Sequence, residues 1–115
     1  MTADPSSVRS IRWENSTAIV ELSGDVDMHQ TPKTHRAIVG VCDRKPKTLV
    51  VSLEDVPYID SSGIGMLVDV FRRLKTQGAV MRLCGLNERV RGVFEITKLD
   101  RFFLIYAGLQ EALAG

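Results

Sequence analysis

Long hydrophobic runs are missing from this chain of 115 residues. No stretch approaches the roughly 20 apolar residues that a membrane-spanning helix needs, so we expect no insertion into a membrane. Residues 1–7 lack both the basic region and the apolar region of a secretory signal peptide. These two absences lead us to expect a cytoplasmic protein.

The chain also lacks an excess of charge of either sign. It has 15 Lys and Arg residues and 14 Asp and Glu residues, so the net charge is +1. Nucleic-acid-binding domains carry a basic patch or stripe, so we expect no direct contact with nucleic acid. Cysteine is scarce. Cys42 and Cys84 have no metal-ligand spacing, and we expect two reduced thiols that fill space in the core. The sequence therefore predicts neither a metal site nor a disulfide.

The chain does have the composition of a globular domain, with 44% hydrophobic and 25% charged residues. Its length suggests one domain, residues 1–115, around one core. Residues 1–6 are polar and contain Pro5, so we expect a flexible end there.

Hydrophobic periodicity predicts strands that alternate with helices. Strand patterns occur at residues 8–13, 17–23, 48–53, 79–84 and 102–105, and helical patterns begin near Thr31, Ser62, Asn87 and Gly108. The order β-β-α-β-α-β-α-β-α favours an α/β fold whose mixed, mostly parallel sheet has about five strands and about four helices. In open sheets of this kind, functional residues tend to follow the carboxyl ends of the strands.

Several helix signals refine this prediction. Thr31 is the expected N-cap of the first helix, with Pro32 at the first helical position. Asn87 is the expected cap of the third helix, and Gly78 the expected stop of the second. The second helix carries an apolar stripe that we expect to face the core, made of Ile64, Leu67, Val68, Phe71 and Leu74.

The stretch Asp60-Ser61-Ser62-Gly63-Ile64-Gly65 connects a strand to the second helix. Three consecutive N-cap residue types place two hydroxyls at the positive end of a helix, where backbone N–H groups are unpaired. A phosphate would be favoured there, and the two glycines are expected to keep the surface low and accessible.

Four interpretations of this stretch compete. It can be simply a helix cap and loop. A nucleophilic serine would need a base, and nothing places His29 or His35 beside it; Gly-x-Ser-x-Gly is also absent. A phosphate-binding loop would need a lysine that is missing. The fourth interpretation is phosphorylation by a partner kinase, which would add about −1.5 to −2 charges without disturbing the fold.

The same stretch resembles the signature of the STAS domain, and in particular the stand-alone bacterial anti-sigma factor antagonists. Gly24-Asp25-Val26-Asp27 resembles the family's Gly-Glu-(apolar)-Asp segment. The resemblance extends from about Ser10 to Ala114, and its C-terminal part is carried by Asn87, Val90, Phe94, Thr97, Leu99, Phe102, Ile105 and Ala112-Leu113.

This resemblance implies a partner-switching regulator that is not an enzyme and holds no cofactor. The unphosphorylated antagonist would bind an anti-sigma factor, which is also a serine kinase with a histidine-kinase-like ATPase fold. Phosphorylation of the serine after the aspartate, here Ser61, would release it, and a PP2C-type serine phosphatase would reset it. The implied partner-binding residues are Asp25, Asp27, Asp60, Ser62, Gly63 and Ile64.

Three departures from the family pattern are visible. Asp25 stands where the family usually has glutamate, and Ile64 where leucine is commoner; both changes are conservative. Ser62 adds a second hydroxyl, so the choice of Ser61 rests on the resemblance and Ser62 is the second choice. The alternatives that remain are a non-catalytic scaffold subunit, in a stress-sensing complex or a lipid ABC transporter, and a small-molecule or nucleotide sensor.

Overall fold

A computed structural model describes residues 6–115 of the chain. Within them the strands are β1 (Val8–Glu14), β2 (Thr17–Ser23), β3 (Thr48–Asp55), β4 (Val80–Cys84) and β5 (Leu104–Tyr106). The helices are α1 (Thr31–Asp43), α2 (Ser61–Thr76), α3 (Glu88–Ile96) and α4 (Leu109–Ala114), with a short 3₁₀ helix, η1 (Leu99–Arg101).

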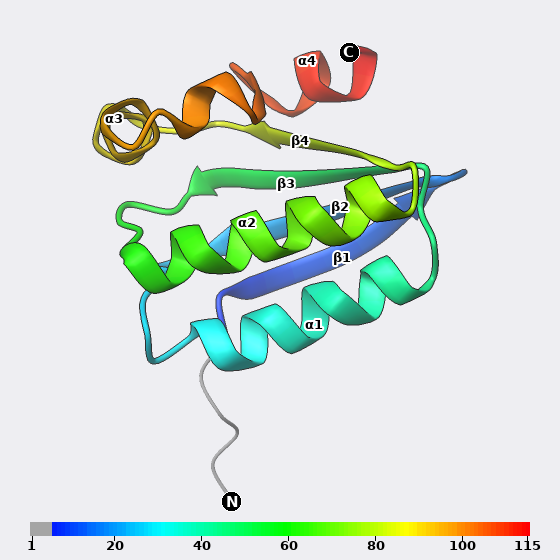
Figure 1. The fold of residues 1–115 in the computed structure, drawn as a ribbon, viewed down its shortest axis with the longest axis horizontal. Helices are drawn as coiled ribbons and strands as arrows, with labels where there is room; N and C mark the ends of the chain where they lie inside the picture. The colour runs from blue at the N-terminus through cyan, green and yellow to red at the C-terminus, as the bar shows by residue number, and fades with distance from the viewer. Residues whose placement is uncertain (1–5) are drawn as a thin grey trace, which may run out of the picture.

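The five strands form one sheet in the order β1-β2-β3-β4-β5 (Figure 1). β1 and β2 are an antiparallel hairpin whose turn contains Asn15 in a left-handed conformation. The other neighbouring pairs are parallel. The predicted fold class, a mixed and mostly parallel sheet with four α-helices, is therefore confirmed.

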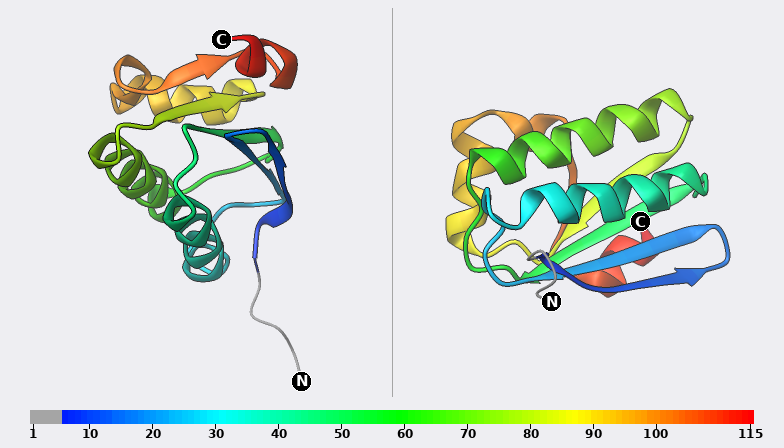
Figure 2. Two further views of the ribbon diagram at one scale, coloured as in Figure 1. Left: turned by 90° about the vertical axis from the view of Figure 1, so that its right-hand side faces the viewer. Right: turned by 90° about the horizontal axis from the view of Figure 1, so that it is seen from below.

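The helices are divided unequally between the two faces of the sheet. Each parallel connection in a sheet is right-handed, so a strand order that never reverses puts α1, α2 and α3 on the same face. Their apolar side chains join the main core. α4 covers the opposite face, where Ala112 packs against Ile19 and Val50 (Figure 2).

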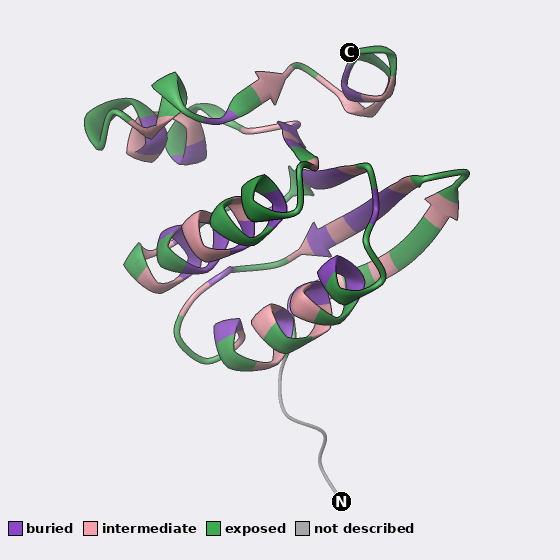
Figure 3. Ribbon diagram, turned by 45° about the vertical axis from the view of Figure 1, so that its right-hand side comes forward, coloured by how far each residue is buried: buried purple, intermediate pink, exposed green. Residues whose placement is uncertain are grey.

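β3 lies at the centre of this arrangement. Leu49 and Val51 point into the main core and Val50 into the smaller cluster beneath α4. The strand is therefore buried on both faces, which is typical of a nearly continuous apolar run in a parallel sheet. Figure 3 shows the buried residues along the inner strands and on the inner sides of the helices, whereas the edge strands β1 and β5 have none. Cys42 and Cys84 are buried and not disulfide-bonded, and burial raises the pKa of both thiols.

The predicted flexible end falls largely on residues 1–5, which lie outside the described part of the chain. Ser7 is buried, and its backbone N–H donates to the hydroxyl oxygen of Thr34 over 2.8 Å. This hydrogen bond holds the chain against α1 from Ser7 onward.

The start of α1 differs from the prediction. Its N-cap is Gln30, and Thr31 is already the first helical residue. The chain makes a turn before the helix, in which the N–H groups of Gln30 and Thr31 both donate to the carbonyl of Asp27. This turn, which only the tertiary structure reveals, starts the helix one residue early and points the Thr31 hydroxyl at Ser62.

The apolar stripe of α2 was predicted only in part. Ile64, Leu67 and Leu74 are buried as expected, whereas Val68 and Phe71 are only half-buried. Met66 and Val70 are buried instead. α2 packs against α1 as well as against the sheet, so its buried side is turned toward α1.

The last strand also begins later than expected, at Leu104. η1 occupies residues 99–101, after Lys98 in a left-handed conformation. Phe102 is therefore not part of the strand, and its side chain is 63% exposed.

Candidate functional site

Two loops meet at the carboxyl ends of the neighbouring parallel strands β2 and β3. Val26 and Ile59 form a parallel bridge. The N–H of Val26 donates to the carbonyl of Tyr58 over 2.9 Å, and the N–H of Asp60 donates to the carbonyl of Val26 over 3.1 Å. These bonds continue the β2–β3 pairing past the strands and hold residues 24–30 against the start of α2.

Asp60 organises the start of α2 as its N-cap. Its Oδ1 accepts hydrogen bonds from the N–H of Ser62 at 2.9 Å, the N–H of Gly63 at 3.1 Å and the hydroxyl of Ser62 at 2.6 Å. Its Oδ2 accepts from the N–H of Met28 at 3.2 Å, in the other loop. One carboxylate thus caps the helix and fastens the two loops together.

These hydrogen bonds also set the charge of Asp60. Partial burial raises the pKa of the carboxyl, but the bonds from the Ser62 hydroxyl and from the Gly63, Ser62 and Met28 N–H groups outweigh burial. The pKa of Asp60 therefore lies below its ordinary value of 3.8. The carboxylate is negative at neutral pH, directly beside the two serines.

The two serines have different environments. Ser62 is half-buried; its hydroxyl donates to Asp60 and lies 3.1 Å from the hydroxyl of Thr31. Ser61 is exposed at the first position of α2, and its hydroxyl makes no hydrogen bond to any of residues 6–115. The structure therefore separates two hydroxyls that the sequence could not, one engaged between the helices and one facing solvent.

The two glycines of the stretch also differ. A Cβ on Gly63 would lie 2.6 Å from Cγ1 of Ile59 and 2.9 Å from the carbonyl oxygen of Val26. Gly63 is buried because the two loops close over it, so it does not lower the surface as expected. Gly65 is exposed and faces open space, which fits the expectation. Ile64, also among the expected partner-binding residues, is buried in the core.

The aspartates of the neighbouring loop lie close by. Asp27 is half-buried, and its Oδ1 accepts a hydrogen bond from the N–H of His29 at 2.9 Å. Asp25 is exposed, and its carbonyl accepts from the Ser7 hydroxyl at 3.1 Å. Because the neighbouring Met28 N–H bonds to Asp60, the structure brings this acidic loop next to the start of α2.

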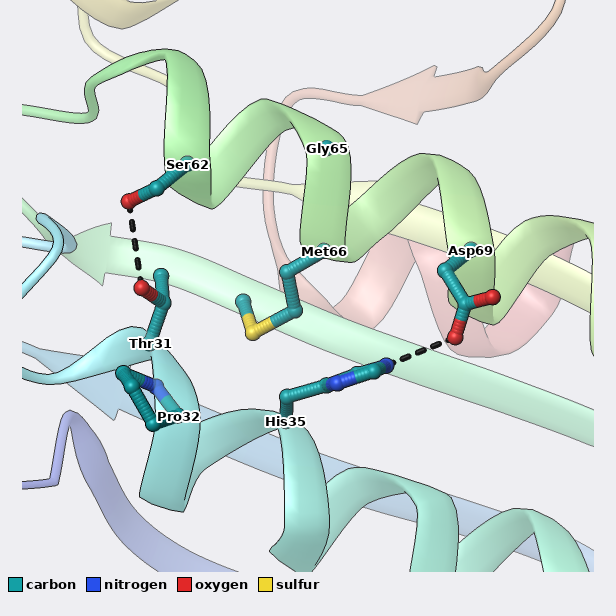
Figure 4. Close-up of a pocket in the computed structure, with 7 residues that line it drawn as sticks. All are labelled: Thr31, Pro32, His35, Ser62, Gly65, Met66 and Asp69. Atoms are coloured by element: carbon teal, nitrogen blue, oxygen red, sulfur yellow. Dashed lines mark hydrogen bonds and ion pairs between the residues drawn. The ribbon is translucent and has the colours of Figure 1, made fainter.

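The histidines do not make a nucleophile of either serine. His35, on α1, points to α2, where its Nε2 lies 2.6 Å from Oδ2 of Asp69 (Figure 4). Hydrogen bonds from Arg73 and from His35 lower the pKa of Asp69. His35 and Ser62 line the same surface pocket of about 280 Å³, yet the hydroxyl of Ser62 bonds to Asp60 and not to the imidazole. The geometry gives no Ser–His couple.

Two exposed side chains beside the site, Met28 and Tyr58, were not predicted from the sequence. Met28 is exposed, although its N–H bonds to Asp60. Tyr58 is also exposed, beneath the guanidinium of Arg89 at 5.3 Å. Runs such as Met28-His29-Gln30 carry no recognisable signal, because the bond to Asp60 comes from the backbone.

Asn87 connects α3 to one of the two loops of the site. Its side chain caps α3 by accepting from the N–H of Val90 at 2.7 Å, as predicted. The same side chain donates to the carbonyls of Val56 and Pro57 at 3.3 and 3.4 Å. The start of α3 is thereby tied to the loop that precedes Asp60.

Residues 6–115 contain neither a membrane-spanning helix nor a cluster of metal-ligand side chains. No helix there is both long enough and apolar enough to cross a bilayer. No three His, Cys, Asp or Glu side chains gather there in a way that could hold a metal ion.

Comparison with known proteins gives a consistent result. The STAS domain family model matches residues 10–112. An anti-sigma-B factor antagonist of Bacillus subtilis is 34% identical over 80 residues, which cover 70% of this chain and 72% of the relative.

Solved structures agree with this match. The crystal structure of an anti-sigma factor antagonist from Mycobacterium paratuberculosis has a TM-score of 0.84 and 26% identity, over 91% of this chain and 89% of that one. The Bacillus cell fate determinant SpoIIAA in its phosphorylated form has a TM-score of 0.73 and 21% identity, over 91% and 96% of the two chains. At that identity the second likeness concerns the fold alone.

Proposed function

The chain belongs to the STAS domain family, and on this premise we propose that it is an anti-sigma factor antagonist controlled by phosphorylation of Ser61. In its unphosphorylated form it binds an anti-sigma factor in the cytoplasm. The curated relative from Bacillus subtilis, named as an antagonist of this kind, supports the role. The chain itself acts as a regulator and performs no catalysis.

The exposed hydroxyl of Ser61 is the observation that carries this proposal. A kinase must reach the hydroxyl oxygen without first breaking the fold. Ser61 offers an oxygen that is not hydrogen-bonded within the described chain, whereas Ser62 would have to leave Asp60 and Thr31. Accessibility therefore favours Ser61 over Ser62 as the acceptor.

The position of Ser61 also suits a switch that acts on binding. A phosphate at the first position of α2 faces the positive end of the helix dipole, so the fold tolerates it. The same phosphate stands next to the negative Asp60. An anti-sigma factor docked over this surface would meet about −1.5 to −2 additional charges there. Binding is lost while the domain stays folded.

The partners follow from this role. The anti-sigma factor is also the serine kinase, with a histidine-kinase-like ATPase fold, and a PP2C-type phosphatase removes the phosphate. The partner contacts an acidic surface made of Asp25, Asp27 and Asp60. Ser62 lies next to this surface, where its hydroxyl donates to Asp60. Gly63 and Ile64 contribute through the packing of the first turn of α2 against the loops, because both are buried.

Phosphosite mapping tests the proposal. The full chain is incubated with ATP and the anti-sigma kinase of the same organism, and the products are mapped by mass spectrometry. Ser61→Ala should abolish phosphorylation, and the matched variant Ser62→Ala should retain it. No phosphate on either serine would rule out the switch.

Binding measurements complete the test. Ser61→Asp should weaken binding to the anti-sigma factor by about tenfold or more, with a melting temperature close to that of the wild type. Ser61→Ala should bind like the wild type. If Ser61→Asp binds equally well, an electrostatic switch at this position is wrong.

A further inference from the structure

A second surface lies toward the other end of α2, away from Ser61. Two adjoining hollows of about 320 Å³ each run between α2, residues 99–104 and the start of β4. We call them together the α2–η1 groove. They share Phe71, Lys75 and Phe102. The rings of Phe71 and Phe103, which meet edge to face with centroids 5.3 Å apart, line the first hollow.

The rim of this groove is unusually apolar for a surface. Phe102 is 63% exposed, Leu104 48% and Val80 38%, and all three line the same hollow. Exposed apolar residues that are scattered singly need no explanation, but a contiguous group beside a concave surface is typical of an interaction site.

The charges at the groove have one sign. In the described chain the charged side chains that line it are Arg72 and Lys75, both exposed. Neither forms an ion pair within residues 6–115, whereas Arg73, on the same helix, is bonded to Asp69 at 2.8 Å. The two cations beside the groove are therefore not paired with a carboxylate of residues 6–115.

We propose that the α2–η1 groove is a second protein-docking surface, which binds an acidic amphipathic segment of a partner protein. The apolar floor and rim accept one face of a helix whose side chains repeat at i, i+3, i+4 and i+7. Carboxylates beside that face pair with Arg72 and Lys75. Apolar burial supplies the affinity, and charge complementarity selects an acidic partner over a basic one.

This docking is independent of the state of Ser61. The groove residues on α2 are 7 to 14 positions beyond Ser61, or about 10–21 Å at 1.5 Å per residue. A phosphate on Ser61 acts across solvent with a screening length of about 8 Å at physiological salt, so its field barely reaches the groove. The second partner therefore stays bound in both states of the proposed switch.

Three synthetic helical peptides of equal length provide the probe. The first has apolar residues at the helical spacing and Glu elsewhere. The second keeps the apolar residues and replaces Glu with Lys, and the third keeps Glu and replaces the apolar residues with Ser. Binding to the ¹⁵N-labelled full chain is followed by NMR chemical-shift changes. Only the first peptide should bind, with the changes confined to residues 68–75, 79–81 and 99–104, and raised salt should weaken it.

Variants of the chain locate the site. The double variant Arg72→Glu/Lys75→Glu should weaken binding about tenfold, and Phe102→Ser should weaken it similarly. Both alter exposed side chains, so both should fold. Ile96→Ser is the matched control, because Ile96 is an 83% exposed apolar residue that does not line the groove.

Several outcomes would overturn the proposal. They are failure of the acidic peptide to bind, equal binding of the acidic and basic peptides, and unchanged binding to the charge-reversed variant. Sedimentation of the wild type as a dimer that Phe102→Ser dissociates would instead identify a second copy as the occupant. Ser61→Asp should bind the acidic peptide as tightly as the wild type does. Peptide binding to the groove therefore tests the groove alone, and it does not depend on whether the phosphorylation switch is correct.

Discussion

A new carboxylate at the start of α2 should affect stability very differently at position 61 and at position 62. In Ser61→Asp the new carboxylate occupies the first position of the helix, where the native hydroxyl bonds to none of residues 6–115. In Ser62→Asp it replaces a hydroxyl that donates to Asp60 at 2.6 Å and lies 3.1 Å from Thr31. The two variants have the same charge and composition, so each is the control for the other.

The magnitudes follow from these contacts. For Ser61→Asp, a favourable dipole interaction of about 0.3–1 kcal/mol is offset by repulsion from the nearby Asp60. The net change should be within about 0.5 kcal/mol of zero. Ser62→Asp loses a hydrogen bond to a charged group, about 1.5–3 kcal/mol. It also puts a second carboxylate against the first in a half-buried site, so we expect a total loss of about 2–4 kcal/mol.

Urea unfolding at pH 7, followed by circular dichroism, measures this difference. With a slope of about 2 kcal/mol per molar urea, the middle of the usual range, the midpoint of Ser62→Asp should fall by about 1–2 M, while that of Ser61→Asp should barely move. Ser62→Ala should fall between them, because it loses the bond without adding charge. Equal midpoints for the two aspartate variants would refute the assignment of an engaged Ser62 and a free Ser61.

Two further predictions concern the same loops. Gly63→Ala should lower the free energy of unfolding by about 1–3 kcal/mol, because its Cβ would meet the backbone carbonyl of Val26 at 2.9 Å; the exposed Gly65→Ala should raise it by about 0.5–1 kcal/mol, and thermal melts of equal stability would contradict the packing. Asp60→Asn should lower the free energy of unfolding by about 1 kcal/mol at neutral pH, because the bonds from Ser62 and Gly63 lose a charged acceptor and the amide nitrogen cannot accept from the Met28 N–H. Because the pKa of Asp60 is lowered, its contribution is present above pH 3.8 and is lost as the pH falls through the lower value in the folded state; urea midpoints of wild type and variant should therefore converge in acid, and a gap that persists there would contradict the charged cap.

The sequence was a good guide wherever the signal was local. The period of two in residues 17–23 gave β2 with its observed bounds. The side chain of Asn87 caps α3 and Gly78 has the left-handed conformation of a helix stop, as predicted. The two helix signals succeed because the contacts that they report join residues only a few positions apart. The period of two succeeds for another reason: successive side chains of a strand point to opposite faces of the sheet, whichever strands lie beside it.

The same reasoning failed where a distant part of the chain decides. Thr31 has the residue type of an N-cap, yet the turn held by the Asp27 carbonyl makes Gln30 the cap. Met66 lies beside the predicted stripe of α2, but the packing of α1 along that side buries it. Periodicity in the sequence shows which side chains lie on the same side of a helix. It does not show how much of the helix surface the neighbouring helices and strands will bury.

The sequence by itself determined the order of strands and helices, the central buried β3 and the position of a serine pair at a helix start. Only the tertiary structure decided that Ser62 is held between Asp60 and Thr31 while Ser61 faces solvent. The physical reason is that the partner of Ser62 on α1 lies 31 positions earlier in the chain. The α2–η1 groove likewise exists because elements far apart in sequence leave Phe102 uncovered.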